Sequence, residues 1–229
     1  MKDGIIIKGI SGFYYVEVGQ DLYECKARGI FRKKGLSPLV GDRVAISIID
    51  ETDKKGNIEK IYERKTELVR PPIANIDKVL ITFSVKEPSP NMVLLDRFIV
   101  FSEKENLDIR IVLTKVDLDK DGTIVDRIVS DYEKIGYKVI PVSVETGQGV
   151  DQVRHELEGC ISVFAGQSGV GKSSILNAIE PDFKLETAEI SQKLGRGKHT
   201  TRHSQLYKLG PNAIVADTPG FSSFDLTDI

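Results

Sequence analysis

The residues with the clearest chemical potential form a glycine-rich run in the last third of the chain. The run consists of Gly166, Gln167, Ser168, Gly169, Val170, Gly171, Lys172, Ser173 and Ser174, and it follows an apolar segment, Ile161 to Ala165. Its first eight residues match the spacing G-x-x-x-x-G-K-[ST], in which backbone amides and the lysine bind nucleotide phosphates and the serine hydroxyl can join a Mg²⁺ shell. The alternative is a glycine-rich turn that only caps a helix. The complete match between a predicted strand and a predicted helix favours the phosphate site.

Two polar groups earlier in the chain also follow predicted strands. The first contains Thr114, Lys115 and Asp117. The Asp117 carboxylate can accept hydrogen bonds from N1–H and the 2-amino group of guanine, and the Lys115 stem can lie along the base. The second contains Ser143 and Val144, where backbone amides can meet guanine O6. A loop lysine and aspartate are often only solvated, but beside a phosphate loop this pattern predicts a guanine pocket.

A third group, Asp217-Thr-Pro-Gly220, follows the predicted strand Ala213 to Ala216. An aspartate here can hold Mg²⁺, directly or through water, and the Gly220 amide can contact a γ-phosphate. With Ser173, it indicates a magnesium-bound nucleoside triphosphate as the substrate.

The elements that must position these residues fall into two parts. In residues 1–68, short apolar runs are broken by turn formers, which is typical of a β-barrel. Pro71-Pro72 lies in a predicted linker, residues 69–76, and residues 77–229 alternate strands with helices. That alternation indicates an α/β fold, a mostly parallel sheet covered on both faces, with its chemistry at the carboxyl ends of the strands.

The predicted element boundaries follow from the apolar periodicity. The barrel strands are Gly4–Ile10, Phe13–Val18, Leu22–Ala27, Arg43–Ile49 and Ile58–Tyr62, and Gly29–Ser37 is an exposed loop. The later strands are Lys78–Val85, Asp108–Thr114, Tyr137–Val142, Cys160–Ala165, Ser204–Leu209 and Ala213–Ala216. The helices are Asn91–Glu105, Thr123–Ile135, Val150–Leu157 and Lys172–Ile179.

Composition excludes several classes of protein. The 229 residues carry a net charge of −2, which argues against a protein that coats nucleic acid indiscriminately. Residues 1–70 are slightly basic, with 14 Lys+Arg against 11 Asp+Glu, which is compatible with RNA contact or with a random imbalance. No apolar run is long enough to span a membrane, so we expect a cytoplasmic protein. Cys25 and Cys160 are expected to be reduced, and three histidines offer no zinc site.

The order of the motifs is permuted relative to the GTPase superfamily, because base recognition precedes phosphate binding. With Gly41-Asp-Arg-Val44, Leu94-Leu-Asp-Arg97 and Gly197-Lys-His-Thr-Thr-Arg202, the chain resembles the circularly permuted GTPases of the small-subunit-dependent RsgA (YjeQ, YloQ, CpgA) family over its whole length. The resemblance implies an N-terminal OB-fold barrel followed by a circularly permuted P-loop GTPase domain. It also implies a GTPase that acts in late maturation of the small (30S) ribosomal subunit.

Further roles come from that resemblance. Residues 182–203 would be a switch loop, with Thr201 as a third Mg²⁺ ligand beside Ser173 and Asp217, and Thr200 as the alternative. Phe221 stands where GTPases often have a water-orienting glutamine, so intrinsic hydrolysis should be slow. His199, or a group from the ribosome, would then position the water. The predicted catalytic residues are His199, Lys172 and Thr201.

The resemblance also implies partners and a cofactor. The small ribosomal subunit and 16S rRNA are the expected partners of a monomeric, GTP–Mg²⁺-binding protein. The candidate RNA contacts on the barrel are Arg32, Lys33, Lys34 and Arg43, with Tyr14, Tyr15 and Tyr23 as possible stacking residues or core residues. The family normally continues into a helical domain that holds zinc. This chain stops at Ile229, so we expect no zinc ligands in it.

Other functions remain open at this stage. A non-catalytic, GTP-responsive RNA-binding switch would also contain these motifs. A permuted GTPase of the large subunit is a further alternative, against which the N-terminal barrel argues. A metabolic P-loop kinase is the most remote, because it should lack a guanine-selective pocket.

Overall fold

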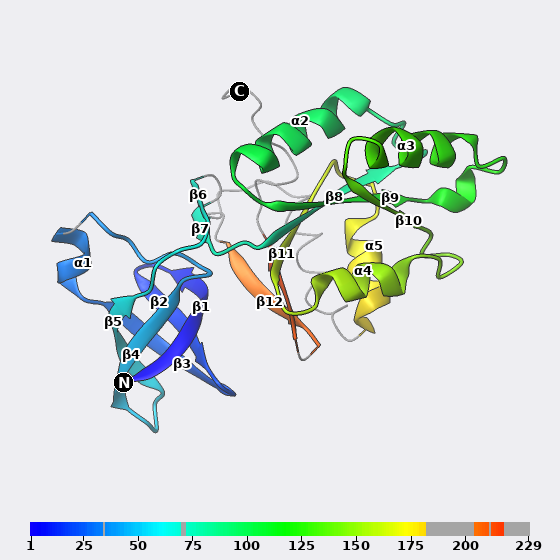
Figure 1. Cartoon of the computed structure of the whole chain (residues 1–229). Helices are drawn as coiled ribbons and strands as arrows, with labels where there is room; N and C mark the ends of the chain where they lie inside the picture. The colour runs from blue at the N-terminus through cyan, green and yellow to red at the C-terminus, as the bar shows by residue number, and fades with distance from the viewer. Residues whose placement is uncertain (34, 70–71, 182–203, 211, 218–229) are drawn as a thin grey trace.

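The computed structural model describes residues 1–33, 35–69, 72–181, 204–210 and 212–217. The chain forms an N-terminal barrel and an α/β domain, joined by a short hairpin (Figure 1). Both parts agree with the fold class that the sequence predicts.

The barrel contains five strands that close on themselves. They are β1 (Lys2–Ile10), β2 (Phe13–Val18), β3 (Asp21–Ala27), β4 (Arg43–Asp50) and β5 (Lys55–Ile61). The strands pair in the order β1-β2-β3-β5-β4, and β4 pairs back onto β1, with Gly4 opposite Val44. Closure leaves no free sheet edge and encloses a core that includes Ile6, Val16 and Ile46.

One detail of the barrel differs from the sequence-based expectation, and another decides between two alternatives for Tyr23. Residues 29–33 form a short helix, α1 (Gly29–Lys33), inside the segment predicted as a loop. Tyr23 is fully buried in the barrel core, so it cannot stack on a base. Its ring packs inward because Leu22, Glu24 and Lys26 occupy the alternate, outward positions of β3.

A hairpin follows the barrel, with strands β6 (Glu67–Val69) and β7 (Pro72–Ala74). Leu68, Ile73 and Ala74 are buried, and Val40 of the barrel bridges to Ile73. The segment predicted as a linker therefore contains a strand that packs against the barrel.

The α/β domain is built on a six-strand arrangement. Its strands are β8 (Lys78–Ser84), β9 (Asp108–Thr114), β10 (Lys138–Val142), β11 (Ile161–Ala165), β12 (Gln205–Leu209) and β13 (Ala213–Asp217). Their order is β10-β9-β8-β11-β13-β12, and every neighbouring pair is parallel except β12 with β13. One further pairing, Lys8 with Gln205, joins β12 to β1 and makes the sheet continuous with the barrel.

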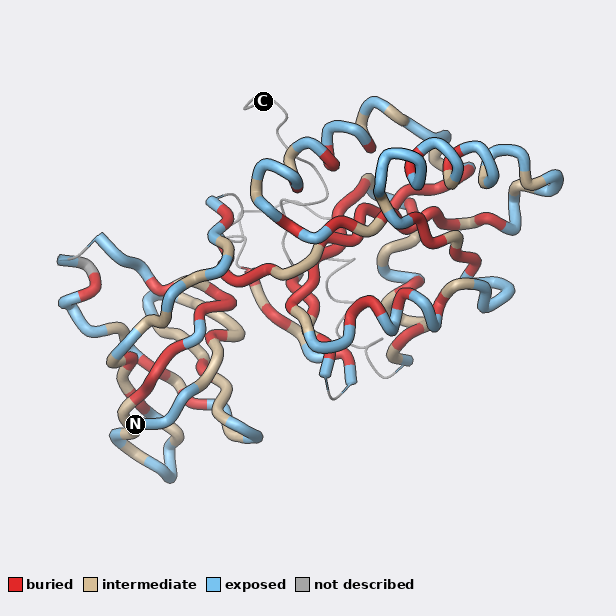
Figure 2. The backbone as a smooth tube through the Cα atoms, viewed as in Figure 1, coloured by how far each residue is buried: buried red, intermediate tan, exposed pale blue. Residues whose placement is uncertain are grey.

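Helices cover both faces of this sheet, as predicted. The helices α2 (Met92–Lys104) and α3 (Thr123–Glu133) lie on one face, and α4 (Val150–Leu157) and α5 (Lys172–Ile179) lie on the other (Figure 1). Alternate strand residues divide between two cores: Ile81 and Ile111 pack toward α2 and α3, and Leu80 and Val112 toward α4 and α5. Figure 2 accordingly shows the central strands buried and each helix buried along one side. Within the described part of the chain, no helix combines the length and apolarity needed to cross a bilayer.

Candidate nucleotide site

The sheet has one point where its strand order reverses. From β8 the chain moves outward to β9 and β10, and then returns to β11 on the other side of β8. Ligands of open α/β sheets bind in the crevice outside the carboxyl ends of the strands at such a point. The glycine-rich run begins directly after β11, at this position.

The backbone of the glycine-rich run can be formed only with glycine at its fixed positions. Gly166 has φ of +133°, and a β-carbon there would come within 2.1 Å of the Thr82 carbonyl oxygen on β8. Gly171 has φ of +102° and directly precedes α5. The loop therefore bends sharply out of β11 and delivers its last residues to the start of a helix, where unpaired amides attract anions.

Lys172 lies within this loop. Its ammonium donates hydrogen bonds to the carbonyl oxygens of Gly166 (2.6 Å) and Gln167 (2.7 Å). Burial lowers the pKa of Lys172 to about 8, because a desolvated ammonium is disfavoured. Ser173 and Ser174 follow on the exposed first turn of α5. The loop thus presents one cation and two hydroxyl groups at a helix N-terminus.

Thr114 joins the phosphate loop to the predicted base-recognition residues. Its hydroxyl group lies 2.5 Å from the Val170 carbonyl oxygen in the loop and 3.2 Å from the Phe83 carbonyl oxygen on β8. The Thr114 side chain is buried, so these contacts are shielded from water. Two segments more than 50 residues apart in sequence are therefore held together by one side chain.

The remaining base-recognition residues lie along the same edge of the sheet. Thr114 pairs with Ser84 on one side and Val142 on the other, so that Lys115 and Ser143 begin neighbouring loops. Asp117 lies exposed in a 3₁₀ turn, Val116–Leu118, and its carboxylate is accessible to a ligand. Ser143 is buried and its hydroxyl accepts a hydrogen bond from the Thr146 amide (3.2 Å). Val144 is 39% exposed beside it.

Sequence reasoning missed the loop between β8 and α2. Lys115 donates from its ammonium to the Glu87 carbonyl oxygen, and the Ser84 hydroxyl donates to the Pro88 carbonyl oxygen (2.9 Å). A β-carbon at Gly169 would meet the Pro88 ring at 4.0 Å. This loop therefore supports both the base-recognition loop and the phosphate loop. The prolines in its sequence indicate only a turn, and no local signal shows what the turn contacts.

Some predicted site residues lie outside the described part of the chain. These are Thr201, His199 and Gly220, and the Asp217 side chain is also outside it. The backbone of Asp217 ends β13, which runs parallel to β11 with Ala216 opposite Val163. Asp217 therefore ends its strand at the same edge of the sheet as Ala165, and the loop after Ala165 leads to Ser173 at the start of α5. The carboxylate oxygens of Asp217 and the hydroxyl oxygen of Ser173 are the donors that Mg²⁺ prefers, so the site fits this ion.

No other metal site is apparent among the described residues, where no three His, Cys, Asp or Glu side chains cluster. Cys25 and Cys160 are both free thiols. Burial raises the pKa of Cys25 to about 11, so this thiol is inert at neutral pH.

The fold and the site together define a circularly permuted P-loop GTPase. Comparison with known proteins makes the assignment specific: the RsgA GTPase family matches residues 61–227, and the RsgA N-terminal domain matches residues 3–58. The chain belongs to the RsgA GTPase family.

Individual relatives agree with this assignment. A protein named small ribosomal subunit biogenesis GTPase RsgA, from Alkaliphilus metalliredigens, is 51% identical over 226 residues, which are 99% of this chain and 77% of the relative. Among solved structures, YjeQ from Thermotoga maritima has a TM-score of 0.84 at 36% identity, covering 100% of this chain and 78% of that chain. YloQ, described as a circularly permuted GTPase, has a TM-score of 0.76 at 40% identity, covering 100% and 75%.

Proposed function

We propose that this protein hydrolyses GTP as an assembly factor in late maturation of the small (30S) ribosomal subunit. The contact between Thr114 and the Val170 carbonyl carries the nucleotide part of the proposal, because it joins a guanine-recognition loop to a phosphate loop in one site. The names of the relatives, which are small ribosomal subunit biogenesis GTPases, support the partner.

The proposed chemistry follows from the residues at the site. Lys172 and the amides after Gly166 would bind the triphosphate, while Asp117 would select guanine over adenine. Ser173, Asp217 and Thr201 would hold Mg²⁺, which when bound offsets charge on the β- and γ-phosphates. We propose His199 as the residue that orients the attacking water, since Phe221 has no polar group to do so.

Finer features of the function belong to the same proposal. We propose 16S rRNA as a contact of the barrel, on which Lys33 and Arg43 are exposed. Arg32 and Lys34 are candidates whose side chains lie outside the described residues. We further propose that the protein acts as a monomer in the cytoplasm.

Phosphate release with and without purified small subunits tests the proposal. The wild-type protein should turn over slowly alone and much faster with small subunits, whereas large subunits should have little effect. His199→Ala should lose most of the stimulation but keep GTP binding. Asp117→Asn should shift base preference from guanine toward xanthine, which serves as the control for binding in the proposed pocket.

The rival functions give different results. A non-catalytic switch would bind small subunits in a GTP-dependent manner without faster turnover. A factor for the large subunit would be stimulated by large subunits instead. A kinase would prefer ATP in a binding competition, and that result would overturn the guanine pocket.

A further inference from the structure

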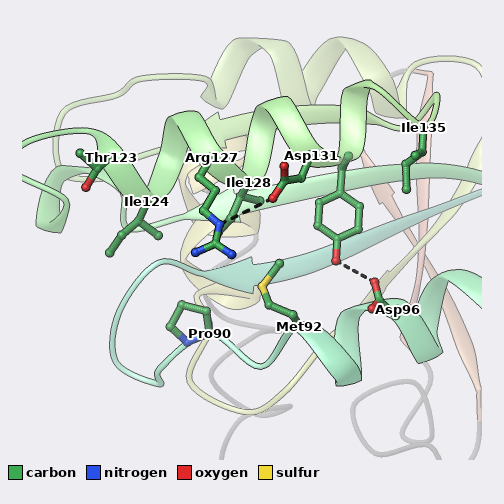
Figure 3. Close-up of a pocket in the computed structure, with 10 residues that line it drawn as sticks. Pro90, Met92, Asp96, Thr123, Ile124, Arg127, Ile128, Asp131 and Ile135 are labelled. Carbon is green, nitrogen blue, oxygen red and sulfur yellow. Dashed lines mark hydrogen bonds and ion pairs between the residues drawn. The ribbon is translucent and has the colours of Figure 1, made fainter.

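A groove lies between α2 and α3, on the sheet face opposite α4 and α5. It has a volume of about 680 Å³, within the usual size of binding clefts. Figure 3 shows it from the side, with Ile124, Arg127 and Asp131 of α3 above Pro90 and Met92 at the start of α2. The nucleotide site gives this groove no role.

The α3 side of the groove carries apolar side chains among polar ones. Ile124 and Ile128 are four residues apart on one face of α3, and Ile135 lies in the turn that follows the end of the helix at Glu133. Ile128 is buried, but Ile124 is 39% exposed and Ile135 is 66% exposed. Ile124 and Ile135 are therefore open to a partner.

The charged side chains that line the groove are two carboxylates, Asp96 and Asp131, and one arginine, Arg127. Asp96 accepts a hydrogen bond from the Tyr132 hydroxyl (2.7 Å), and Asp131 makes only a loose ion pair with Arg127 (3.7 Å). The side chains of Arg127 and Asp131 are 83% and 56% exposed, so both can rearrange. Residues 117–135, which include α3, contain six carboxylates against three basic side chains.

This combination selects one kind of partner. The groove has a net negative charge and lies beside the acidic segment 117–135, which disfavours a phosphate backbone, because that backbone needs several lysine or arginine side chains opposite it. It fits a helix with apolar side chains at i, i+3 or i+4 and i+7 and a basic residue for Asp131 or Asp96. We propose that the groove docks a basic, amphipathic helix of a small-subunit protein, an inference that rests on the proposed function.

Both helices of the groove begin at loops of the nucleotide site. α2 follows the loop whose Glu87 carbonyl accepts from Lys115. Asp119, which lies two residues after Asp117, accepts a hydrogen bond from the Val125 amide in the first turn of α3 (2.9 Å). A partner seated on these helices would therefore contact elements that carry the base-recognition residues.

Binding of variants to intact small subunits and to protein-free 16S rRNA tests the inference. The variants are Ile124→Glu with Ile135→Glu, and separately Asp131→Lys, compared with Val100→Glu as a control. Val100 is 54% exposed on α2 but does not line the groove. Affinity is measured for intact small subunits and for protein-free 16S rRNA, with a non-hydrolysable GTP analogue bound.

The groove variants should bind intact subunits at least about fivefold more weakly, the effect of losing one significant contact, and should bind naked 16S rRNA unchanged. The control should match the wild type on both. Equal losses on subunits and naked rRNA would show that the groove contacts RNA and would overturn the inference. Unchanged binding to subunits would overturn it too.

Two further outcomes concern the identity of the partner. Self-association of the free wild-type protein, abolished by the groove variants, would assign the groove to a second copy of the chain and reject the ribosomal partner. A wild-type protein that binds no small subunits at all would reject the proposed function and the inference together. Normal wild-type binding with unaffected variants rejects the inference alone.

Discussion

At the scale of single residues, Thr114 connects the phosphate loop with strand β8 at the candidate nucleotide site. Its hydroxyl contacts carbonyl oxygens in the phosphate loop and on β8, and its backbone lies between β8 and β10. Many GTPases have asparagine at this position. The shorter threonine still reaches both carbonyls here because the loop approaches closely: a β-carbon added at Gly171 would lie only 3.8 Å from the Thr114 hydroxyl.

Replacing Thr114 with valine should weaken GTP binding. Valine keeps the shape but leaves the buried Val170 and Phe83 carbonyls without this donor, a loss of roughly 1–2 kcal/mol, or about 5- to 30-fold in affinity. Thr114→Ser, which keeps the hydroxyl, should stay within a fewfold of the wild type. Titration with a fluorescent guanine nucleotide measures both. Unchanged binding by Thr114→Val would mean that the hydroxyl makes no contribution to the nucleotide site.

Lys172 should make nucleotide binding depend on pH. Burial holds its pKa at about 8 in the free protein, whereas phosphate favours the charged form and raises the pKa on binding. Below pH 8 the lysine is already charged, so this group adds no pH dependence there. As pH rises through 8, binding must take up a proton, and affinity should fall, approaching about tenfold per pH unit.

Calorimetry of GTP-analogue binding in buffers of different ionisation enthalpy measures that proton uptake. The wild type should take up a proton at pH 9 but not at pH 7. Lys172→Arg is the matched comparison, because arginine stays charged throughout this range. It should bind more weakly but without proton uptake. Uptake that persists in Lys172→Arg would assign the titration to another group.

At the scale of elements, one buried carboxylate on α4 binds three strands near their amino ends, at the sheet edge opposite the nucleotide site. Glu156 on α4 accepts from Lys78 (2.8 Å) on β8, Arg110 (2.8 Å) on β9 and Lys138 (2.6 Å) on β10. Burial alone would raise the pKa of Glu156. The hydrogen bonds from Lys138 and Lys78 and the charges of Arg110 and Lys78 outweigh burial and lower the pKa to about 2.

Glu156→Gln should destabilise the α/β domain by roughly 2 kcal/mol at pH 7, because three cations lose their shared partner. The lowered pKa means that the wild-type contribution is complete above about pH 4.5 and is lost as pH falls toward 2. Denaturant unfolding at pH 7 and pH 3 should therefore show a smaller difference between wild type and variant at pH 3. Glu51→Gln, in an exposed pair with Lys2, should have almost no effect at either pH.

The elements that could be predicted from sequence are those set by local periodicity. The predicted bounds of α4, α5 and β9 coincide with the structure, because apolar spacing marks all three locally and a glycine precedes each of the two helices. The hairpin β6–β7 and the loop carrying Glu87 and Pro88 were not predictable in this way. Their conformations depend on contacts with distant residues, such as Val40 with Ile73 and Lys115 with Glu87.

In the candidate site, too, some features could be predicted from local sequence and others depend on contacts between distant residues. Motif spacing predicted the phosphate loop and the base-recognition residues at one sheet edge. The strand registers bring the carboxyl ends of β9 and β11, at Thr114 and Ala165, to that edge, and the binding roles of these residues stay a prediction. The contact of Thr114 with Val170 needed the structure, since it depends on how closely β8, β9 and the loop approach. Nothing in the periodicity of α3 showed that Ile124 and Ile135 stay exposed at the groove.

At the scale of the whole molecule, the described residues join the barrel to the α/β domain through the hairpin β6–β7 and through β12. The first is the hairpin: the Ala74 amide donates to the Val40 carbonyl (2.9 Å), and the buried Asn75 side-chain amide donates to the Gly41 carbonyl (2.9 Å). The second is the pairing of β1 with β12, beside an ion pair between Glu17 and Lys208 (2.7 Å). Residues of both parts consequently belong to one continuous core.

Gly41→Ala should loosen the first of these joints. Gly41 has φ of +90°, and a β-carbon there would lie 2.0 Å from the Ala74 carbonyl oxygen, so the hairpin backbone must move away. We expect a loss of roughly 3 kcal/mol from strain and displaced packing, with faster hydrogen exchange at the Ala74 amide. Gly19→Ala is the matched control, because Gly19 has φ of +64° with no atom within 4 Å and should lose only about 1 kcal/mol. Slow exchange at Ala74 in Gly41→Ala would show that the hairpin is not held through this contact, and that β1 and β12 alone join the two parts.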